Sequence, residues 1–274
     1  MNMDVHAVKT SIRGQHWFQA LTADFSRIEQ GAESVWVADG QMSGKTVRVI
    51  AVVPHQHNLY PRAQHGEVGL LEGWTLAKAV DEVIQADWNN HHKRAIFCIV
   101  DVPSQAYGRR EELFGIHQAL AGAVDSYARA RLAGHPVISL LVGKSMSGAF
   151  LAHGYQANRI IALKDAGVMV HAMGKESAAR VTLRTVDELE KLAASIPPMA
   201  YDIESYATLG LLSDLLTVVN PEQPTTEDIA CVQDAFLQAL NDIQATGSTG
   251  LEHRLHGENR QMSKRVRELL REQW

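Results

Sequence analysis

Residues 137–150, V-I-S-L-L-V-G-K-S-M-S-G-A-F, run from an apolar segment into a group of small residues. The apolar part, 137–142, is typical of a strand that is buried on both faces of a parallel sheet. The small residues from Gly143 onward predict a tight turn, and the pattern over 147–156 predicts a helix after it. The order of strand, turn and helix indicates an α/β fold.

The same alternation extends to both sides of this segment. We predict strands at 34–38, 46–53, 95–100, 159–162 and 167–171, and helices at 71–88, 110–133 and 225–244. Asp39-Gly40 is expected to turn the first two strands into a hairpin. Trp17, Leu21 and Phe25 have the spacing of a short amphipathic helix. The alternation predicts a mainly parallel sheet with right-handed crossovers.

The chain has 274 residues, 46% of them hydrophobic, which is enough for one substantial core. No interior boundary is evident, so we predict a single domain over 1–274. Within it we expect an α/β core at 30–175 and a mainly helical carboxyl-terminal region at 176–274. Thr225 or Thr226 is the expected N-cap of the long helix in that region.

Charge and cysteine content exclude several classes of protein. The net charge of −5 comes from interspersed acidic and basic residues, so we expect no nucleic-acid partner. Two cysteines, Cys98 and Cys231, provide neither a disulfide framework nor a zinc knuckle. We find no segment long enough to span a membrane and no secretory signal at the amino terminus. We therefore expect a cytoplasmic protein without a membrane partner.

The turn at 143–150 has the features of a binding site for a developing negative charge. In open α/β sheets, ligands bind beyond the carboxyl ends of the strands. The N–H groups at the helix start, near Met146, Ser147 and Gly148, are expected to point there, and the helix dipole adds partial positive charge. Such donors stabilise an oxyanion or an enolate, and losing one costs about 3 kcal/mol.

Three other interpretations of this turn were weighed. It could be a tight turn that merely packs a helix on a strand. It could be a nucleophile elbow, G-x-S-x-G, with Ser145 as the nucleophile, although Ser147 stands in place of the final glycine. A phosphate loop is excluded because Ile138 occupies the position of its first glycine.

A second loop follows the preceding buried strand, in the sequence D-V-P-S-Q-A-Y-G at 101–108. Sequential parallel strands end at the same edge of a sheet, so this loop and the turn are expected to face one site. The expected substrate-binding residues are Gln105, Ala106, Tyr107, Gly108 and Gly143. Taken alone, the loop is better explained as an ordinary connection between a strand and a helix.

Histidines give weaker signals. His171 closes an apolar strand and could exchange a proton near neutral pH, although strand-end histidines are more often structural. His55 and His57 could bind a metal, whereas His91 and His92 fit a solvated turn. No metal-ligand spacing is present, and we assign no metal site.

These motifs resemble the carboxyltransferase branch of the crotonase-like superfamily. The segment 101–105, with Glu111 or Glu112 and Gly115 after it, corresponds to that branch's D-T-P-G loop, and 143–150 corresponds to its glycine-rich turn. The phrases at 143–154 and 171–182 are similar to those of the gamma subunits of malonate decarboxylases. The resemblance extends over roughly 30–245 and implies a crotonase-like fold of ββα units.

The resemblance implies a lyase that works within a complex. Its expected partners are a paralogous carboxyltransferase-like beta subunit, an acyl carrier protein and an alpha subunit that exchanges acetyl for malonate. The substrate would be malonyl held as a thioester on the carrier's phosphoribosyl-dephospho-CoA arm, with acetyl thioester and carbon dioxide as products. No cofactor is expected to bind this chain directly.

Departures from the family pattern suggest why biotin would not be needed. Ser104, Ser145, Met146 and Ala149 replace glycines of the two loops. Bulkier residues here, Met146 above all, would close the space that a carboxyltransferase keeps for biotin. This predicts a biotin-independent enzyme.

The expected catalytic residues are Met146, Ser147 and Gly148 as the donor turn, with Ser145 and His171. Donors from Met146 and Ser147 N–H would hold the enolate oxygen, and His171, Tyr107 or Ser145 would protonate the carbanion. Two rival hypotheses stay open. One is a serine hydrolase that acts through Ser145, and the other is a non-catalytic scaffold subunit.

Overall fold

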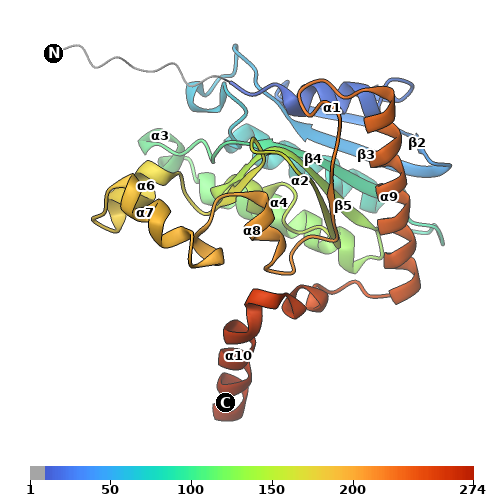
Figure 1. The fold of residues 1–274 in the computed structure, drawn as a ribbon. Helices are drawn as coiled ribbons and strands as arrows, with labels where there is room; N and C mark the ends of the chain where they lie inside the picture. Colours follow the sequence, from blue (N-terminus) through green and yellow to red (C-terminus); the bar gives the residue numbers. More distant parts are fainter. Residues whose placement is uncertain (1–9) are drawn as a thin grey trace.

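The computed structural model describes residues 10–274 as an α/β fold built on one sheet (Figure 1). Residues 1–9, where we expected no secretory signal, lie outside the described part. The strands are β1 (Ser26–Ile28), β2 (Val35–Met42), β3 (Lys45–Val52), β4 (Ala95–Val102), β5 (Val137–Met146), β6 (Arg159–Leu163), β7 (Met169–His171) and β8 (Asp214–Leu216).

Within the described residues the sheet has eight strands in the order β1-β2-β3-β4-β5-β6-β8, and β7 pairs with the end of β5. The β1–β2 and β2–β3 pairs are antiparallel. From β3 through β4, β5 and β6 to β8 every pair is parallel. The prediction of a mainly parallel sheet is confirmed.

Helices cover both faces of the sheet. They are α1 (Arg13–Leu21), α2 (Leu70–Ala86), α3 (Arg109–Leu113), α4 (Ile116–Leu132), α5 (Ser147–Ala152), α6 (Lys175–Val181), α7 (Val186–Ala193), α8 (Ile203–Ala207), α9 (Thr226–Thr246) and α10 (Gln261–Gln273). The ring of Phe97 on β4 contacts Phe236 of α9, whereas its neighbour Cys98 interacts with Tyr127 of α4. Since successive strand residues point to opposite faces, α9 and α4 lie on opposite sides.

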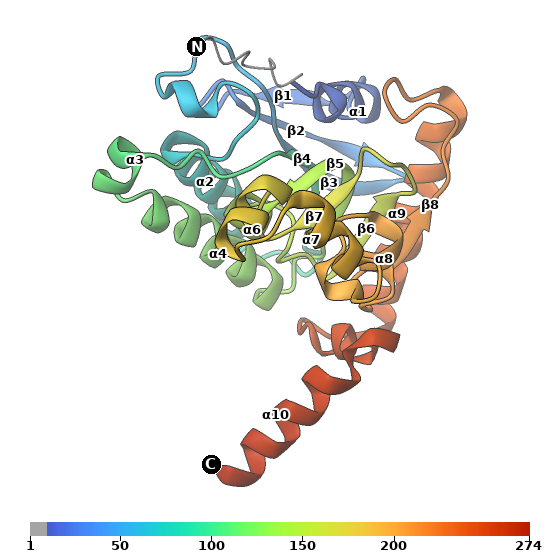
Figure 2. The same ribbon diagram turned by 60° about the vertical axis from the view of Figure 1, so that its left-hand side comes forward.

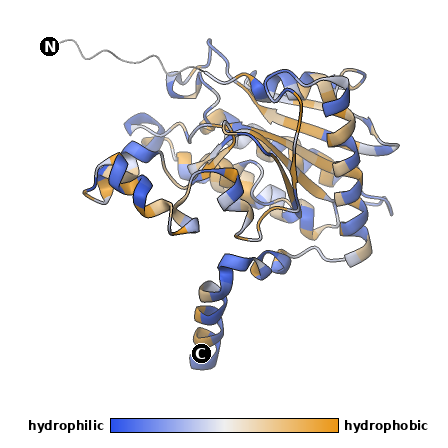
Figure 3. Cartoon of the chain, in the orientation of Figure 1, coloured by the Kyte–Doolittle hydropathy of each residue, from blue (hydrophilic) through white to orange (hydrophobic). Residues whose placement is uncertain are grey.

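The core is formed by the inner strands together with these helices. Every residue of β4 is buried, as are all of β6 and most of β5. Figure 3 shows the apolar colour gathered in the sheet, while polar colour covers the outer helix surfaces. This distribution explains the continuous apolar runs of the sequence, because strands covered on both faces need no polar alternation.

The hairpin turn between β2 and β3 was predicted at the wrong residues. Asp39 and Gly40 lie inside β2, and the turn consists of Ser43 and Gly44, whose φ angles are 50° and 72°. Positive φ at both positions is what a two-residue hairpin requires. Gly40 instead makes room for the Phe25 ring, which lies 2.4 Å from where a Cβ would be.

Two predicted helices also have other bounds in the structure. The helix expected at 110–133 is divided into α3 and α4 by Gly115, whose φ of 79° interrupts the helical backbone. The helix expected at 147–156 ends at Ala152. The region after 176, which was expected to be mainly helical, also contains the short strand β8 beside β6.

The carboxyl-terminal region contains the predicted long helix α9. Thr225 caps it, since its hydroxyl accepts the N–H of Asp228 while the Asp228 carboxylate accepts the Thr225 N–H. Beyond it, α10 projects from the body in both views (Figures 1 and 2). Within the described part, no helix combines the length and apolarity needed to cross a membrane.

Candidate functional site

The loop after β4 is held in place by a short backbone pairing. Val68 donates its N–H to the Ser104 carbonyl at 3.1 Å, and its own carbonyl accepts the N–H of Ala106 at 2.9 Å. Gln105 lies between these two bonds and pairs with Val68 in an isolated bridge. The loop therefore has a defined geometry at the same sheet edge as the start of α5, as the sequence predicted.

The side chain of Gln105 reaches the turn between β5 and α5. Its carbonyl oxygen, Oε1, accepts the Gly148 N–H at 2.6 Å and the Ser147 hydroxyl at 2.7 Å. A Cβ on Gly148 would lie only 2.6 Å from this oxygen, so glycine is needed for the close approach. The turn thus holds two donors that converge on one carbonyl oxygen.

The donors that bind this oxygen differ from the pair we expected. The prediction named the N–H groups of Met146 and Ser147, whereas here the Gly148 N–H and the Ser147 hydroxyl donate. Because α5 has only six residues, its dipole adds little to them. The individual donors therefore supply most of the positive potential.

Met146 has a structural role that the sequence did not reveal. It ends β5 opposite His171 of β7, and its side chain is buried in a satellite core with Ala178, Leu189 and Tyr201. The side chain anchors the helical segment after β7 to the turn. The expectation that Met146 closes a biotin-sized space stays a prediction.

Ser147 adopts a backbone conformation that is rare for a residue with a Cβ. Its φ is 60°, in the left-handed region, at the junction between strand and helix. Such strain costs about 1–3 kcal/mol and persists only where the surrounding structure enforces it. Here it allows the Ser147 hydroxyl and the Gly148 N–H to face one point.

An apolar pocket of about 340 Å³ opens beside the turn. Its walls come from α5, β7 and the segment that leads through α8, which Figure 2 shows gathered beside β7. They are formed by Ser147, Gly148, Phe150, Leu151, Tyr155, Val170, His171, Ala172, Pro198, Ala200, Tyr206, Leu209 and Leu211. The donors therefore lie at the polar end of an otherwise apolar cavity.

His171 belongs to the wall of this pocket. Its ring stacks on Tyr201 with the centroids 4.0 Å apart and 16° between the planes. Its Nδ1 lies 3.2 Å from the Met173 nitrogen and 3.0 Å from the Met173 oxygen. Burial lowers the pKa of the ring below its usual 6.5, although the bond to the Met173 carbonyl acts in the opposite direction.

Ser145 and Gly143 lie behind the turn rather than in the pocket. The Ser145 side chain is fully buried, and its hydroxyl has no hydrogen-bond partner in the described structure. A Cβ on Gly143 would lie 2.1 Å from Oδ1 of Asp101. That carboxylate accepts bonds from Ser11 Oγ at 2.5 Å and Lys144 N–H at 3.2 Å, which joins the amino-terminal segment to β5.

The other residues of the second loop have distinct surroundings. Ala106 is buried, Tyr107 is half exposed, and Gly108 leaves space for Arg62 and Glu111. None of these three lines the apolar pocket. Gln105 is the loop residue that the structure brings to the donors.

The histidines weighed as metal ligands do not gather with other ligands. His55 pairs with Glu33 at 2.8 Å, and the ring of His57 lies 6.1 Å from that of His55. Over residues 10–274, no group of three or more histidine, cysteine, aspartate or glutamate side chains could hold a metal ion.

A buried anchor beneath the turn was missed by the sequence reasoning. His153, directly after α5, lies 3.0 Å from the Ile99 carbonyl through Nε2 and 3.0 Å from the Tyr127 hydroxyl through Nδ1. A carbonyl can only accept, so Nε2 carries the hydrogen and Tyr127 donates to Nδ1. The only signal was a histidine at the end of a small-residue helix, which has no specificity by itself.

Comparison with known proteins was made for both sequence and fold. A family model described as malonate decarboxylase gamma subunit matches residues 63–274. The malonyl-S-ACP:biotin-protein carboxyltransferase MADD of Malonomonas rubra is 32% identical over 199 residues, which are 72% of this chain. The match spans 65% of that protein's length.

Solved structures agree with these matches. A Pseudomonas malonate decarboxylase hetero-tetramer in complex with coenzyme A has a chain 62% identical, with a TM-score of 0.92 over 96% of this chain and 99% of that one. A Pseudomonas MdcD-MdcE hetero-dimer matches with 61% identity and a TM-score of 0.88 over the same shares. Transcarboxylase 12S, at 18% identity and a TM-score of 0.63 over 84% of this chain and 42% of that one, shares the fold alone. The predicted crotonase-like fold class is confirmed.

Proposed function

The chain belongs to the malonate decarboxylase gamma subunit family, and we propose that with a paralogous beta subunit it decarboxylates a malonyl thioester carried by an acyl carrier protein. One structural observation is the main support for the proposed mechanism. The Gln105 carbonyl oxygen is held by the Gly148 N–H and the Ser147 hydroxyl at the end of an apolar pocket. These donors already bind an oxygen that is chemically close to a thioester carbonyl.

In the reaction, the bond between the malonyl α-carbon and its carboxylate breaks and carbon dioxide leaves. The electron pair moves into the thioester carbonyl, whose oxygen becomes an enolate oxygen. When the thioester displaces the Gln105 oxygen, the Gly148 N–H and the Ser147 hydroxyl donate to it and stabilise the negative charge as it develops. The apolar walls favour loss of the charged carboxylate as a neutral gas.

A proton must then reach the carbanion to form the acetyl thioester. Of the three candidates, His171 lines the same pocket as Ser147, whereas Ser145 is fully buried and Tyr107 lies outside that pocket. We assign the proton donor role to His171. Burial lowers the pKa of its ring, so the imidazolium is a stronger acid than a solvated one but is less populated at neutral pH.

The partners are proposed on the basis of the same family membership. A crystallised relative is an MdcD-MdcE hetero-dimer, and another relative acts on malonyl-S-ACP, which supports the beta subunit and the carrier. We further propose that the carrier presents the substrate on a phosphoribosyl-dephospho-CoA arm and that an alpha subunit exchanges acetyl for malonate. The pocket of about 340 Å³ has room for the end of such an arm. The complex is proposed to act in the cytoplasm.

The experiment is to co-express the chain with its beta subunit and to measure carbon dioxide release from a malonyl thioester. We expect release by the pair and a loss of about 10²-fold in kcat when Gly148→Ala crowds the Gln105 oxygen. Gly174→Ala is the matched control, because its Cβ would come no closer than 3.7 Å to another atom. An assembled Gly148→Ala pair with undiminished turnover would support the scaffold hypothesis instead.

The serine hydrolase hypothesis has its own test. Ser145 has no access to solvent, and the Ser147 hydroxyl donates to Gln105 rather than to a histidine. We therefore expect a fluorophosphonate probe to leave both serines unlabelled in the native complex. Stoichiometric labelling of either one, with loss of activity, would favour the hydrolase.

A further inference from the structure

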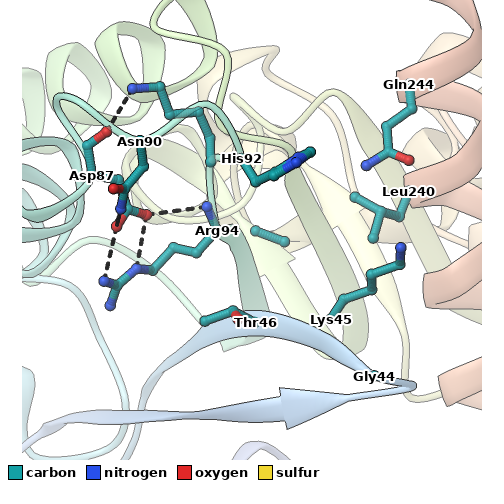
Figure 4. A pocket seen from close by; sticks show the side chains of 11 residues that line it. Gly44, Lys45, Thr46, Asp87, Asn90, His92, Arg94, Leu240 and Gln244 are labelled. Atoms are coloured by element: carbon teal, nitrogen blue, oxygen red, sulfur yellow. Dashed lines mark hydrogen bonds and ion pairs between the residues drawn. The ribbon is translucent and has the colours of Figure 1, made fainter.

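Two adjoining cavities lie at the opposite end of the sheet from the candidate site. They measure about 380 and 490 Å³ and share Lys45, His92, Lys93 and Gln244 in their walls. We call them together the cationic cleft. Figure 4 shows Lys45 extending from β3 towards Gln244 of α9, while His92 reaches towards the same space from the loop before β4.

The cleft is separate from the proposed decarboxylation site. Its walls include Lys45, Ala95 and Pro136, at or next to the first residues of β3, β4 and β5, whereas Gly148 follows the last residue of β5. A strand of ten residues such as β5 spans roughly 30 Å. A ligand in the cleft is therefore not a reactant of the decarboxylation.

The cleft carries more positive charge than its walls neutralise. Seven basic side chains line it: Lys45, His91, His92, Lys93, Arg94, Arg131 and His135. Among the lining residues Asp87 is the only carboxylate, and Arg94 binds both of its oxygens at 2.9 and 3.0 Å. Lys93 donates to the uncharged carbonyls of Asp87 and Trp88 rather than to a carboxylate.

Arg131 is the least compensated of these charges. It is 9% exposed, and its guanidinium bonds the Thr249 carbonyl, while Nε has no partner in the described structure. Within the described residues no carboxylate comes within 4.0 Å of it, and only Glu252 acts on it from a distance. A buried cation without a counter-ion is destabilising, so the neighbouring cavity is a natural place for an anion.

His135 adds an unpartnered group to the same wall. Its side chain is 1% exposed, and Nδ1 lies 3.0 Å from the Arg94 carbonyl, to which it can only donate. The Nε2 atom is buried and has no hydrogen-bond partner in the described part of the chain. Burial lowers the pKa of this ring, so a hydroxyl or a protonated phosphate oxygen of a ligand in the cleft would donate to Nε2 of the neutral ring.

We propose that the cationic cleft binds a small phosphorylated ligand through its phosphate groups. Lysine, arginine and histidine from four separate segments, β3, the loop before β4, α4 and the turn after it, surround one space, which suits a compact anion of multiple charge. The combined volume admits a ligand of nucleotide size. Such a ligand would stabilise the subunit from the edge opposite to the reaction.

The test is calorimetric titration of the assembled complex with pyrophosphate, ADP, inorganic phosphate and malonate at low salt. We expect one pyrophosphate or ADP site per copy of this chain, and weaker binding of inorganic phosphate. Lys45→Gln should weaken pyrophosphate binding about tenfold, and Arg131→Gln more than that. Lys78→Gln, an exposed lysine outside the cleft, is the matched control and should leave the affinity unchanged.

Lys45 is exposed, so its variant tests the site even if the Arg131 variant fails to fold. Three outcomes would overturn the proposal. They are no binding of pyrophosphate or ADP up to about 10 mM, equal weakening by Lys45→Gln and Lys78→Gln, and tighter binding of malonate than of pyrophosphate. Equal affinities for pyrophosphate and ADP would support it and would show that the phosphates alone are recognised.

Discussion

The carbonyl oxygen of Gln105 lies 2.6 Å from the backbone nitrogen of Gly148 and accepts its hydrogen. Gln105 lies in the loop after β4 and Gly148 at the start of α5 after β5, and the Ser147 hydroxyl donates to the same oxygen. In the proposed mechanism this side-chain oxygen occupies the position of the thioester oxygen, and the substrate must displace it.

Gln105→Glu is therefore expected to impair the reaction. A carboxylate accepts hydrogen bonds more strongly than an amide, so it would hold the Gly148 N–H and place a negative charge beside the enolate. We expect kcat/KM for the malonyl thioester to fall about 10²-fold. Gln105→Ala, which vacates the position, should lower it by less than the glutamate variant does. Equal activity of the glutamate variant and the wild type would contradict a shared oxygen position.

Ser147 allows the hydroxyl and the backbone to be separated. Ser147→Ala and Ser147→Gly both remove the hydroxyl donor, so both should lower kcat by about 10²-fold. Only glycine relieves the left-handed φ of 60°, so the glycine variant should be more stable than the alanine variant by about 1 kcal/mol. Carbon dioxide release and urea unfolding measure the two effects. If both variants retain the wild-type kcat, the Ser147 hydroxyl has no part in the mechanism.

Gly143→Ala tests the packing of the turn against Asp101. The new methyl group would lie 2.1 Å from Oδ1, which already accepts the Lys144 N–H. Overpacking of this kind should destabilise the chain by about 3 kcal/mol. Gly174→Ala, with no atom closer than 3.7 Å to its Cβ, should change stability by less than about 1 kcal/mol. If Gly143→Ala and Gly174→Ala have equal unfolding midpoints in urea, the turn accommodates the added methyl group without loss of stability.

His153 predicts an acid-sensitive fold. Burial lowers its pKa to about 4, so the unfolded chain, with a pKa near 6.5, binds the proton more readily. The contribution of His153 to stability is present above pH 6.5 and is lost as the pH falls from 6.5 to about 4, by about 3 kcal/mol. Urea unfolding at a series of pH values measures this loss.

Two variants isolate the histidine in that experiment. His153→Gln should be less stable at pH 7, because the Tyr127 hydroxyl and the Ile99 carbonyl lose their partner, but its stability should depend less on pH. Tyr127→Phe removes one hydrogen bond and keeps the titrating ring, so it should retain the acid sensitivity. The same pH dependence in His153→Gln and the wild type would assign the effect to other groups.

Local patterns were sufficient for much of the fold. The apolar runs that became β4, β5 and β6 are buried on both faces, and the capping pattern at Thr225 placed the start of α9. The shared edge of the two loops also followed from the strand order alone. These features depend on burial period and on short-range hydrogen bonds, which neighbouring residues determine.

Other features depended on contacts between distant segments. Asp39-Gly40 has the composition of a turn, yet Asp39 pairs with Arg48 and Arg94, and Gly40 receives the Phe25 ring. The three residues of β8 carry little signal of their own and became a strand because the edge of β6 was free to pair with them. The packing of Met146 against Ala178, Leu189 and Tyr201 likewise joins residues that are far apart in the sequence.

By itself, the sequence determined the parallel sheet, because the periodicity of its apolar residues predicts buried strands. It also determined the position of the turn before Gly148 and the family of the chain, because both depend on short contiguous motifs. Only the tertiary structure decided that Gln105 meets Gly148, that Ser145 is buried and that no carboxylate of the described residues lies at ion-pair distance from Arg131. Hydrogen-bond partners, solvent access and charge compensation belong to pairs of residues far apart in the chain, and folding alone brings such pairs together.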